Sequence, residues 1–283
     1  MDGIIIINKE KNWTSNDIVQ KLKHTFHEKT GHTGTLDPLA TGVLPILVGK
    51  GTSLSKYLVN HDKEYIATIR LGEKTSTGDQ EGEIIEKKPV TDDMFDAENV
   101  RKVLSEFKGK QNQIPPMYSA IKVNGKKLYE YARSGKKVEI EPREIEIFDI
   151  DLISISKDMK EIVYKVWCSK GTYIRSLCVD IAKKLGYPGH MSHLERRQAG
   201  RFLITDCITL EQLENDDYSL HSIDDALCGF PQLKLDDPTP VYHGKQIKSD
   251  LTGQVAIYDN QNHLLAIYES TGQGYLKNVR GLW

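Results

Sequence analysis

The segment from Gly31 to Gly42 is the part of this sequence best suited to chemistry. It reads Gly-His-Thr-Gly-Thr-Leu-Asp-Pro-Leu-Ala-Thr-Gly, and its three glycines permit unusual backbone angles and close approach of a ligand. Pro38 restricts the backbone of the preceding residue, Asp37. A carboxylate on a stiffened loop is a group that a scaffold can present to a substrate. Taken alone, Asp37 could equally form an Asx-type turn with backbone amides.

Two other kinds of site fit this region poorly. A phosphate-binding loop has four residues between its glycines and Ser or Thr after its lysine, whereas six residues separate Gly42 from Gly49 and Gly51 follows Lys50. The glycine-rich segment could still act as an anion-binding nest in a phosphate- or sugar-processing enzyme. No metal is expected, because the nearby histidines share no convincing ligand spacing with carboxylates: His24, His27 and His32.

The composition excludes several classes of protein. The chain has 283 residues, 39% of them hydrophobic, which suits one large domain and a small one. Its longest apolar run, Ile4 to Ile7, is far too short to span a bilayer, and the N-terminus does not resemble a secretory signal. The four cysteines form no C-x-x-C pair, so we expect neither a zinc framework nor a disulfide scaffold. A cytoplasmic protein is the expectation.

Charge is segregated along the chain although the net charge is only −2. Basic residues are concentrated in residues 101–143 and 165–201, and residues 206–225 are acidic. Such segregation can create a strong local positive field, or it can simply mark solvated surfaces. The first basic block interleaves tyrosines with cations, a pattern that suits a folded RNA loop, and we expect RNA contacts from Lys122, Lys126, Lys127 and Arg133.

Short strands and helices must position these groups. Residues 3–9 have the β-branched content of a buried strand, and Thr14 or Ser15 should cap the helix that follows. Residues 43–48 are expected to form a strand, and Pro45 suggests that it lies at the edge of a sheet or is irregular at that residue. Residues 82–87 could pair with a strand at 64–71. The pattern is α+β with a largely antiparallel sheet. Further strands are expected at 138–155 and 162–169, and helices at 54–59, 97–107, 128–133, 174–185 and from 209.

The character of the chain changes near Phe230. Residues 233–240 contain acidic residues and two prolines, which is typical of a linker. Two apolar runs, 255–258 and 264–268, predict a strand pair. We therefore expect a catalytic domain at residues 1–232 and a small β domain at residues 233–283.

Several motifs together resemble the TruB family of pseudouridine synthases. Gly31 to Pro45 is similar to the family's catalytic signature G-H-T-G-x-L-D-P-x-A-x-G-x-L. Asp62 to Tyr65 resembles its tyrosine motif, residues 114–133 its central motif, and Cys168 to Arg175 its arginine motif. The tail resembles its small PUA-type domain. Two places depart from the pattern: Glu10 stands where the family has proline, and residues 195–200 are offset from its L-R-R motif.

The resemblance implies a fold and an activity. The fold would be the pseudouridine synthase fold, with a central, mainly antiparallel mixed sheet flanked by helices and a small PUA-like domain. The activity would be isomerisation of the T-loop uridine at position 55 of tRNA, after base flipping, with no cofactor. The partner would be the T-arm of tRNA. A monomer without an obligate protein partner is expected.

The resemblance also assigns roles to residues. Asp37 would be the essential carboxylate, acting either as a nucleophile or as a base at C2′. Arg175 would keep it ionised, and Tyr65 would stack on the flipped uracil. The substrate-binding residues would be Lys9, which supports the site, His32, which helps to extrude the base, and Leu194, which forms an apolar wall. A different class of function remains open, that of a non-catalytic chaperone that binds and folds tRNA.

Overall fold

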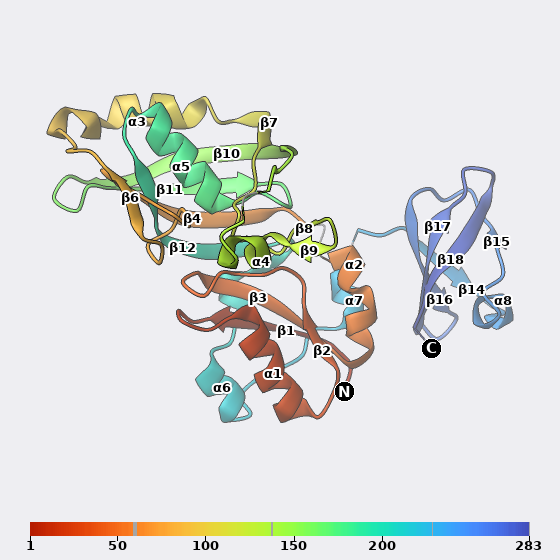
Figure 1. The fold of residues 1–283 in the computed structure, drawn as a ribbon. Helices are drawn as coiled ribbons and strands as arrows, with labels where there is room; N and C mark the ends of the chain where they lie inside the picture. Colours follow the sequence, from red (N-terminus) through yellow and green to blue (C-terminus); the bar gives the residue numbers. More distant parts are fainter. Residues whose placement is uncertain (59–60, 137, 228, 283) are drawn as a thin grey trace.

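The large sheet forms the body of the protein. The computed structural model describes residues 1–58, 61–136, 138–227 and 229–282. Within them, nine strands form one sheet in the order β1-β3-β12-β4-β11-β10-β7, with β2 beside β3 and β13 beside β12 (Figure 1). Its strands are β1 (Gly3–Lys9), β2 (Thr30–His32), β3 (Thr41–Val48), β4 (Lys63–Leu71), β7 (Gly109–Gln113), β10 (Arg143–Ser156), β11 (Glu161–Cys168), β12 (Gly189–Ala199) and β13 (Phe202–Leu203).

Short helices flank this sheet and complete an α+β fold, as the sequence predicted. Thr14 caps α1 through a capping box with Asp17, and α1 buries Ile18 and Leu22 against the sheet. The helices are α1 (Ser15–Phe26), α2 (Ser55–Leu58), α3 (Ala97–Ser105), α4 (Leu128–Arg133), α5 (Ile174–Lys184), α6 (Leu210–Glu214) and α7 (Ile223–Ala226), with 3-10 turns at Gly49–Leu54, Asp92–Phe95 and Ile204–Asp206. In the described part of the chain, every helix is too short or too polar to cross a bilayer.

The sheet is mixed because one pair of its strands is parallel. β12 runs parallel to β3 and antiparallel to β4, and the other pairings in this sheet are antiparallel. β12 therefore joins the strand that follows the glycine-rich loop to the strand that carries Tyr65. This junction brings together residues from three distant parts of the sequence.

The pairing predicted for residues 82–87 is wrong, and so is the edge-strand alternative predicted for Pro45. Residues 82–87 do not pair with β4, because β11 and β12 already occupy its two edges. β6 (Ile84–Lys87) instead pairs with β5 (Glu73–Thr75). A turn at Gly72, whose φ is +95°, separates β5 from the end of β4. Pro45 is not on an edge strand. On one side of β3, Pro45 pairs with Ile6 of β1. On the other side, the residues of β3 before Pro45 pair with β12 and those after it pair with β2.

Some predicted boundaries also shift. The long strand predicted from residue 138 begins only at Arg143, because Pro142 has no N–H to donate to the ladder. The helix predicted at 54–59 is a 3-10 turn followed by α2, and Val59 lies outside the described residues. Around Asn124-Gly125 the chain forms a short hairpin of β8 (Lys122–Val123) and β9 (Lys126–Lys127).

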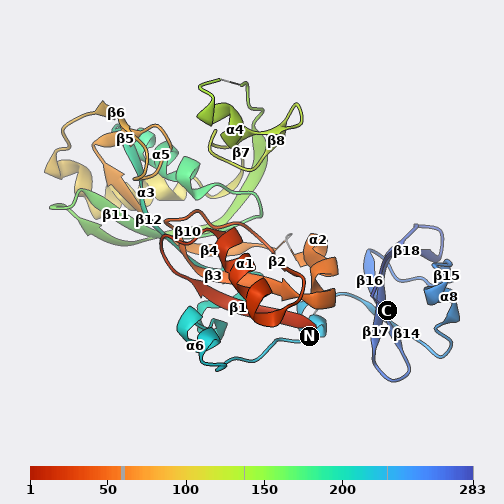
Figure 2. The ribbon, with the colours of Figure 1, turned by 60° about the horizontal axis from the view of Figure 1, so that its bottom comes forward.

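The C-terminal residues form a second sheet. Five strands of the described chain take the order β14-β16-β17-β18-β15. In two views this sheet lies to one side of the large sheet, near α2 (Figures 1 and 2). The linker predicted at residues 233–240 is wrong, because Leu233 and Leu235 alternate with polar residues and form a strand. The elements are β14 (Gln232–Leu235), α8 (Thr239–Tyr242), β15 (Ile247–Lys248), β16 (Gln254–Asp259), β17 (Leu264–Ser270) and β18 (Tyr275–Gly281).

Candidate active site

The loop between β2 and β3 is fixed in place by neighbouring elements. The Ser15 hydroxyl, at the start of α1, accepts from the Leu36 amide at 2.8 Å and lies 3.0 Å from the Leu36 carbonyl oxygen. The carbonyl oxygen of Pro38 accepts from the Asn12 amide at 2.8 Å and from Lys9 Nζ at 3.1 Å. Asp37, between these two anchored residues, therefore sits on a backbone with little freedom to move.

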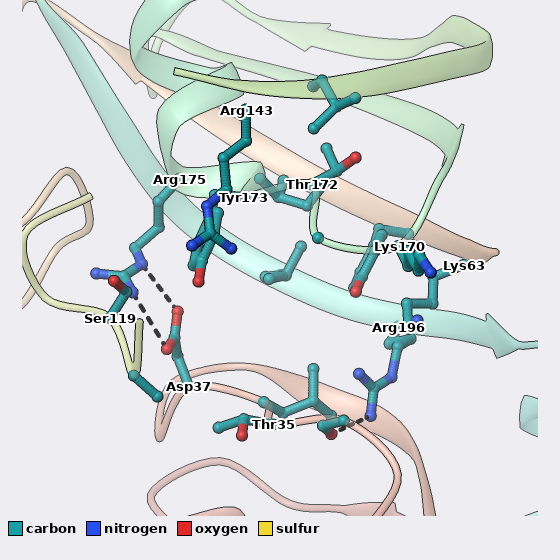
Figure 3. A pocket seen from close by; sticks show the side chains of 18 of the residues that line it. Thr35, Asp37, Lys63, Ser119, Arg143, Lys170, Thr172, Tyr173, Arg175 and Arg196 are labelled. Carbon is teal, nitrogen blue, oxygen red and sulfur yellow. Dashed lines mark hydrogen bonds and ion pairs between the residues drawn. The ribbon is translucent and has the colours of Figure 1, made fainter. Parts of the chain in front are cut away.

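The loop opens onto a cavity of about 700 Å³. This volume lies within the roughly 300–1,000 Å³ of sites that enclose a small molecule. Figure 3 shows Asp37 and Arg175 facing one another across one end of it. The walls come from several parts of the chain: residues 33–37 of the loop, Lys63 and Tyr65 of β4, residues 118–120, Tyr129, residues 143–145 of β10, residues 170–175, and Leu194 and Arg196 of β12.

An ion pair between Asp37 and Arg175 dominates this end of the cavity. Arg175 Nε lies 2.9 Å from Asp37 Oδ2, and Nη2 donates to Oδ1 at 3.3 Å, so the pair is two-pronged. The Arg175 side chain is 6% exposed. The Asp37 side chain is 35% exposed, and it lines the cavity. Burial raises the pKa of Asp37 above its ordinary value, and the Arg175 charge opposes that rise.

Arg175 is itself held by groups that the sequence analysis did not single out. Its Nη1 lies 3.5 Å from Asp79 Oδ2, and its Nη2 donates to the Tyr118 carbonyl oxygen at 2.7 Å. Asp79 is buried, and its Oδ1 accepts from the Thr77 hydroxyl at 2.6 Å. Asp79 also raises the pKa of Asp37, so Arg175 and Asp79 have opposite effects on the charge of Asp37.

A short turn aims Arg175 into the cavity. α5 begins at Ile174, and the residue before it, Tyr173, exchanges two hydrogen bonds with the Gln113 side chain at 2.8 and 3.0 Å. Gly171, with φ +82°, lets the chain turn from β11 into the helix. The first turn of α5 therefore starts from a fixed position beside β7.

Tyr65, Leu194 and Arg196 form the wall beyond Asp37. Tyr65 on β4 pairs with Arg196 on β12, and the Tyr65 and Leu194 side chains are 7% and 6% exposed. Burial raises the pKa of the Tyr65 hydroxyl. Arg196 was not predicted as a site residue, yet it is 1% exposed and donates to the carbonyl oxygens of Val43 at 2.7 Å and Gly34 at 3.1 Å. It thus ties β12 to the glycine-rich loop.

Lys9 and His32 lie behind the loop and do not line the cavity. Lys9 is fully buried, and its Nζ donates to the carbonyl oxygens of Glu10, Trp13 and Pro38. Burial lowers its pKa to about 8. His32 is half-buried on β2, burial lowers its pKa, and its Nδ1 has no hydrogen-bond partner. Lys9 is thus hydrogen-bonded to the loop backbone at Pro38.

The four basic residues predicted for RNA contact lie on the β8–β9 hairpin and α4. Lys122, Lys126 and Arg133 are exposed, and Lys127 is half-buried. None of these four residues lines the cavity, but Tyr129 does. Lys127 Nζ and Arg133 Cζ each lie 5.4 Å from the centre of the Tyr129 ring. Lys127 and Arg133 therefore lie beside one wall of the cavity.

This arrangement can perform nucleophilic or general-base chemistry on a planar, uncharged ring. A carboxylate is held by a buried guanidinium, and a tyrosine and a leucine provide an apolar surface next to it. Among the described residues, no group of three or more His, Cys, Asp and Glu side chains is placed to hold a metal ion.

Comparison with known proteins identifies the family. The model of the N-terminal domain of TruB family pseudouridylate synthases matches residues 21–174, and the model of the tRNA pseudouridylate synthase B C-terminal domain matches residues 175–230. The chain is 45% identical over 271 residues to tRNA pseudouridine synthase B of Francisella tularensis subsp. novicida (strain U112), which covers 92% of this chain and 89% of that protein. The corresponding protein of Francisella philomiragia subsp. philomiragia is 44% identical over the same length.

Solved structures agree on the fold. The structure titled "Crystal Structure of a Cbf5-Nop10-Gar1 Complex" matches with a TM-score of 0.73 and 24% identity, covering 99% of this chain and 85% of that one. A second, "Structure of H/ACA RNP bound to a substrate RNA containing 2'-deoxyuridine", has a TM-score of 0.71, 22% identity and the same coverage. The first family model alone spans more than half of the chain, and the 45% identity extends over nine tenths of it. The chain therefore belongs to the TruB family of pseudouridylate synthases, which are isomerases.

Proposed function

We propose that this protein converts the T-loop uridine at position 55 of tRNA to pseudouridine. The tRNA substrate is supported by the relatives named tRNA pseudouridine synthase B. The single observation that carries the mechanism is the two-pronged pair of Asp37 and Arg175 at one end of a cavity lined by Tyr65. A uridine stacked inside folded RNA cannot reach such a cavity, so the nucleotide must flip out of the stack.

The isomerisation needs a carboxylate but no redox partner. The bond between uracil N1 and ribose C1′ breaks, the uracil turns within the cavity, and C5 bonds to C1′. C5 loses its hydrogen and N1 gains one, so the atomic composition is unchanged. Asp37 initiates this sequence, by attack on the nucleotide or by removal of the C2′ proton. Tyr65 and Leu194 hold the detached uracil by stacking and apolar contact.

We further propose roles for the outer parts of the molecule. Lys122, Lys126, Lys127 and Arg133 contact the backbone of the T-arm, since they are cations on a hairpin and helix next to Tyr129, which lines the cavity. His32 helps to extrude the target base, and Lys9 holds the Asp37 loop through Pro38. Residues 1–232 act as the catalytic domain, and residues 233–283 as a small PUA-like domain that adds RNA affinity.

An unmodified tRNA transcript tests the proposal directly. Incubation with the protein, followed by mapping of pseudouridine, should reveal one modified position in the T-loop. Asp37→Asn should reduce the rate by at least about a hundredfold while the RNA still binds, since a positioned acid or base contributes roughly 10²- to 10⁴-fold.

The matched control is Asp158→Asn, which changes an exposed aspartate in the turn between β10 and β11. It should convert the transcript at the normal rate. An Asp37→Asn protein with full activity would refute the aspartate mechanism. An inactive wild-type protein that still folds tRNA would favour the non-catalytic chaperone.

A further inference from the structure

Three cationic side chains gather at the end of the cavity away from the Asp37–Arg175 pair (Figure 3). Lys63 comes from the start of β4, Lys170 from the turn after β11, and Arg196 from β12. A Cβ atom placed on Gly34 would lie 3.6 Å from Arg196 Nη1 and 3.8 Å from Lys63 Cε. Lys63 and Arg196 therefore both lie beside Gly34 of the glycine-rich loop.

The electrostatic setting of this cluster favours an anion. Burial, together with the charges of Arg196 and Lys170, lowers the pKa of Lys63 to about 8, although Cys168 and Asp62 act to raise it. Arg196 is buried, and the carbonyl oxygens to which it donates orient its guanidinium without neutralising it. A negatively charged ligand would relieve the repulsion between these like charges.

The rest of the cavity indicates which anion this would be. Its lining contains five cationic side chains and two carboxylates, and one of the carboxylates, Asp37, is held by Arg175. A uridine that stacks on Tyr65 remains attached to the RNA strand by its two phosphodiesters. A charged phosphodiester must then pass close to the wall that carries Lys63 and Arg196, since Tyr65 and Arg196 are paired on adjacent strands.

We infer that Lys63, Lys170 and Arg196 form a binding subsite for a phosphodiester that flanks the flipped uridine. The inference rests on the proposed function, because it assumes that an RNA nucleotide enters the cavity. The subsite would hold the strand while Asp37 acts on the ribose, and cationic groups facing a phosphate form strong charge-assisted hydrogen bonds. It would also fix which nucleotide of the loop reaches Tyr65.

The salt dependence of binding measures these contacts. The test uses a T-arm stem-loop RNA, with every protein variant carrying Asp37→Asn to prevent turnover. Each phosphate contact in single-stranded RNA contributes about 0.7 to the slope of log affinity against log salt. The double variant Lys63→Gln/Lys170→Gln removes two of the three cations that face one phosphodiester, so it should lose about 0.7 from that slope. Between about 50 and 200 mM salt, its affinity should therefore fall roughly 2.6-fold less than that of the parent.

A matched double variant controls for the loss of two positive charges. Lys160 and Lys165 belong to the β10–β11 turn and to β11, and Lys165 lies on the strand face opposite the buried Tyr164 and Val166. Lys160→Gln/Lys165→Gln should keep the parent slope. Lys63→Arg/Lys170→Arg should keep it too, because the charge is retained, and this variant separates lost charge from altered folding.

Neutral linkages in the RNA locate the phosphate. A methylphosphonate is placed in turn at each linkage around the target uridine. One position should weaken binding to the parent and have no effect on Lys63→Gln/Lys170→Gln. An unchanged salt slope, or equal sensitivity of both proteins at every linkage, would overturn the subsite. If the wild-type protein makes no pseudouridine but the slope and one linkage respond as described, the proposed function fails and the phosphate subsite stands.

Discussion

The charge on Asp37 depends on two neighbours that act in opposite directions. Arg175 lowers the pKa of the carboxyl, and Asp79, on the far side of the same guanidinium, raises it. Burial adds to the rise. Asp37 must be ionised to act as a nucleophile or base, so the rate should fall as the pH drops through its pKa. This fall in rate at low pH is the acid limb of the pH–rate profile. The pH at which it occurs reports the electrostatic balance around Asp37.

We predict that substitutions of the two neighbours move the acid limb in opposite directions. Arg175→Gln removes the favourable charge, so the pKa of Asp37 rises and the fall in kcat begins at a higher pH. Asp79→Asn removes an unfavourable charge, so the fall begins at a lower pH, although weaker support of Arg175 also reduces the maximal rate. Single-turnover rates with saturating RNA across the acid range check both shifts. Limbs that move in the same direction would contradict this electrostatic account.

At the scale of elements, the junction of β3 and β12 positions the site. Arg196 pairs with Gly42 in the parallel ladder and donates to the carbonyl oxygens of Gly34 and Val43. Gly42 has φ +98°, and a Cβ atom there would lie 2.2 Å from the Arg196 carbonyl oxygen. The glycine at this position is therefore required both by its backbone angle and by the approach of β12.

We predict that Gly42→Ala destabilises the protein more than Gly109→Ala does. Gly109 at the start of β7 has the same φ of +98°, but a Cβ atom there would meet nothing within 4 Å. Gly109→Ala should cost only backbone strain, roughly 1–3 kcal/mol. Gly42→Ala should cost roughly 1–3 kcal/mol more, from overpacking against β12. Urea unfolding of both variants measures the difference, and equal losses would show that the contact with β12 is unimportant.

The elements differ in how well the sequence predicts them. β1, α1 and α5 follow from apolar periodicity and capping residues, which are local signals. The partner of β6 was mispredicted, because the neighbours of β4 come from residues 161–199 and no local pattern reveals them. The strand β14 was taken for a linker because the acidic and proline residues after it masked a short alternation.

The site shows the same division. Asp37, Tyr65, Arg175 and Leu194 were found by their motifs, and the structure brings all four to one cavity. Asp79 was missed because it lies in an ordinary turn of Thr, Gly and Asp residues, and only the fold places it 3.5 Å from Arg175. The burial of Arg196 was also missed, since its contacts lie 153 and 162 residues away along the chain.

At the scale of the whole molecule, the small C-terminal sheet lies beside the large one, near α2, and shares an apolar cluster with it (Figures 1 and 2). Side chains of β1 alternate, so Ile5 and Ile7 face the main core while Ile4 and Ile6 face a second apolar cluster. That cluster includes Ala256, Tyr258, Ile267 and Leu282 from the C-terminal residues. The Tyr258 hydroxyl donates to Asp224 at 2.8 Å, and Arg280 Nη2 donates to the Ser53 hydroxyl at 3.0 Å. The C-terminal sheet thus contributes side chains to an apolar cluster that also contains one face of β1.

We predict that a protein truncated after residue 231 is less stable as well as weaker in RNA binding. Removal of the small sheet uncovers part of the cluster around Ile4 and Ile6, and exposed apolar surface is costly. The truncated protein should have a lower Tm and bind a hydrophobic dye such as ANS. Tyr275→Ala serves as the control, since Tyr275 is 44% exposed on β18 and lies outside the cluster. It should leave Tm and dye binding unchanged. A truncated protein with the wild-type Tm and no dye binding would show that the sheet is an independent RNA-binding attachment, and its loss of affinity could then be assigned to RNA contacts alone.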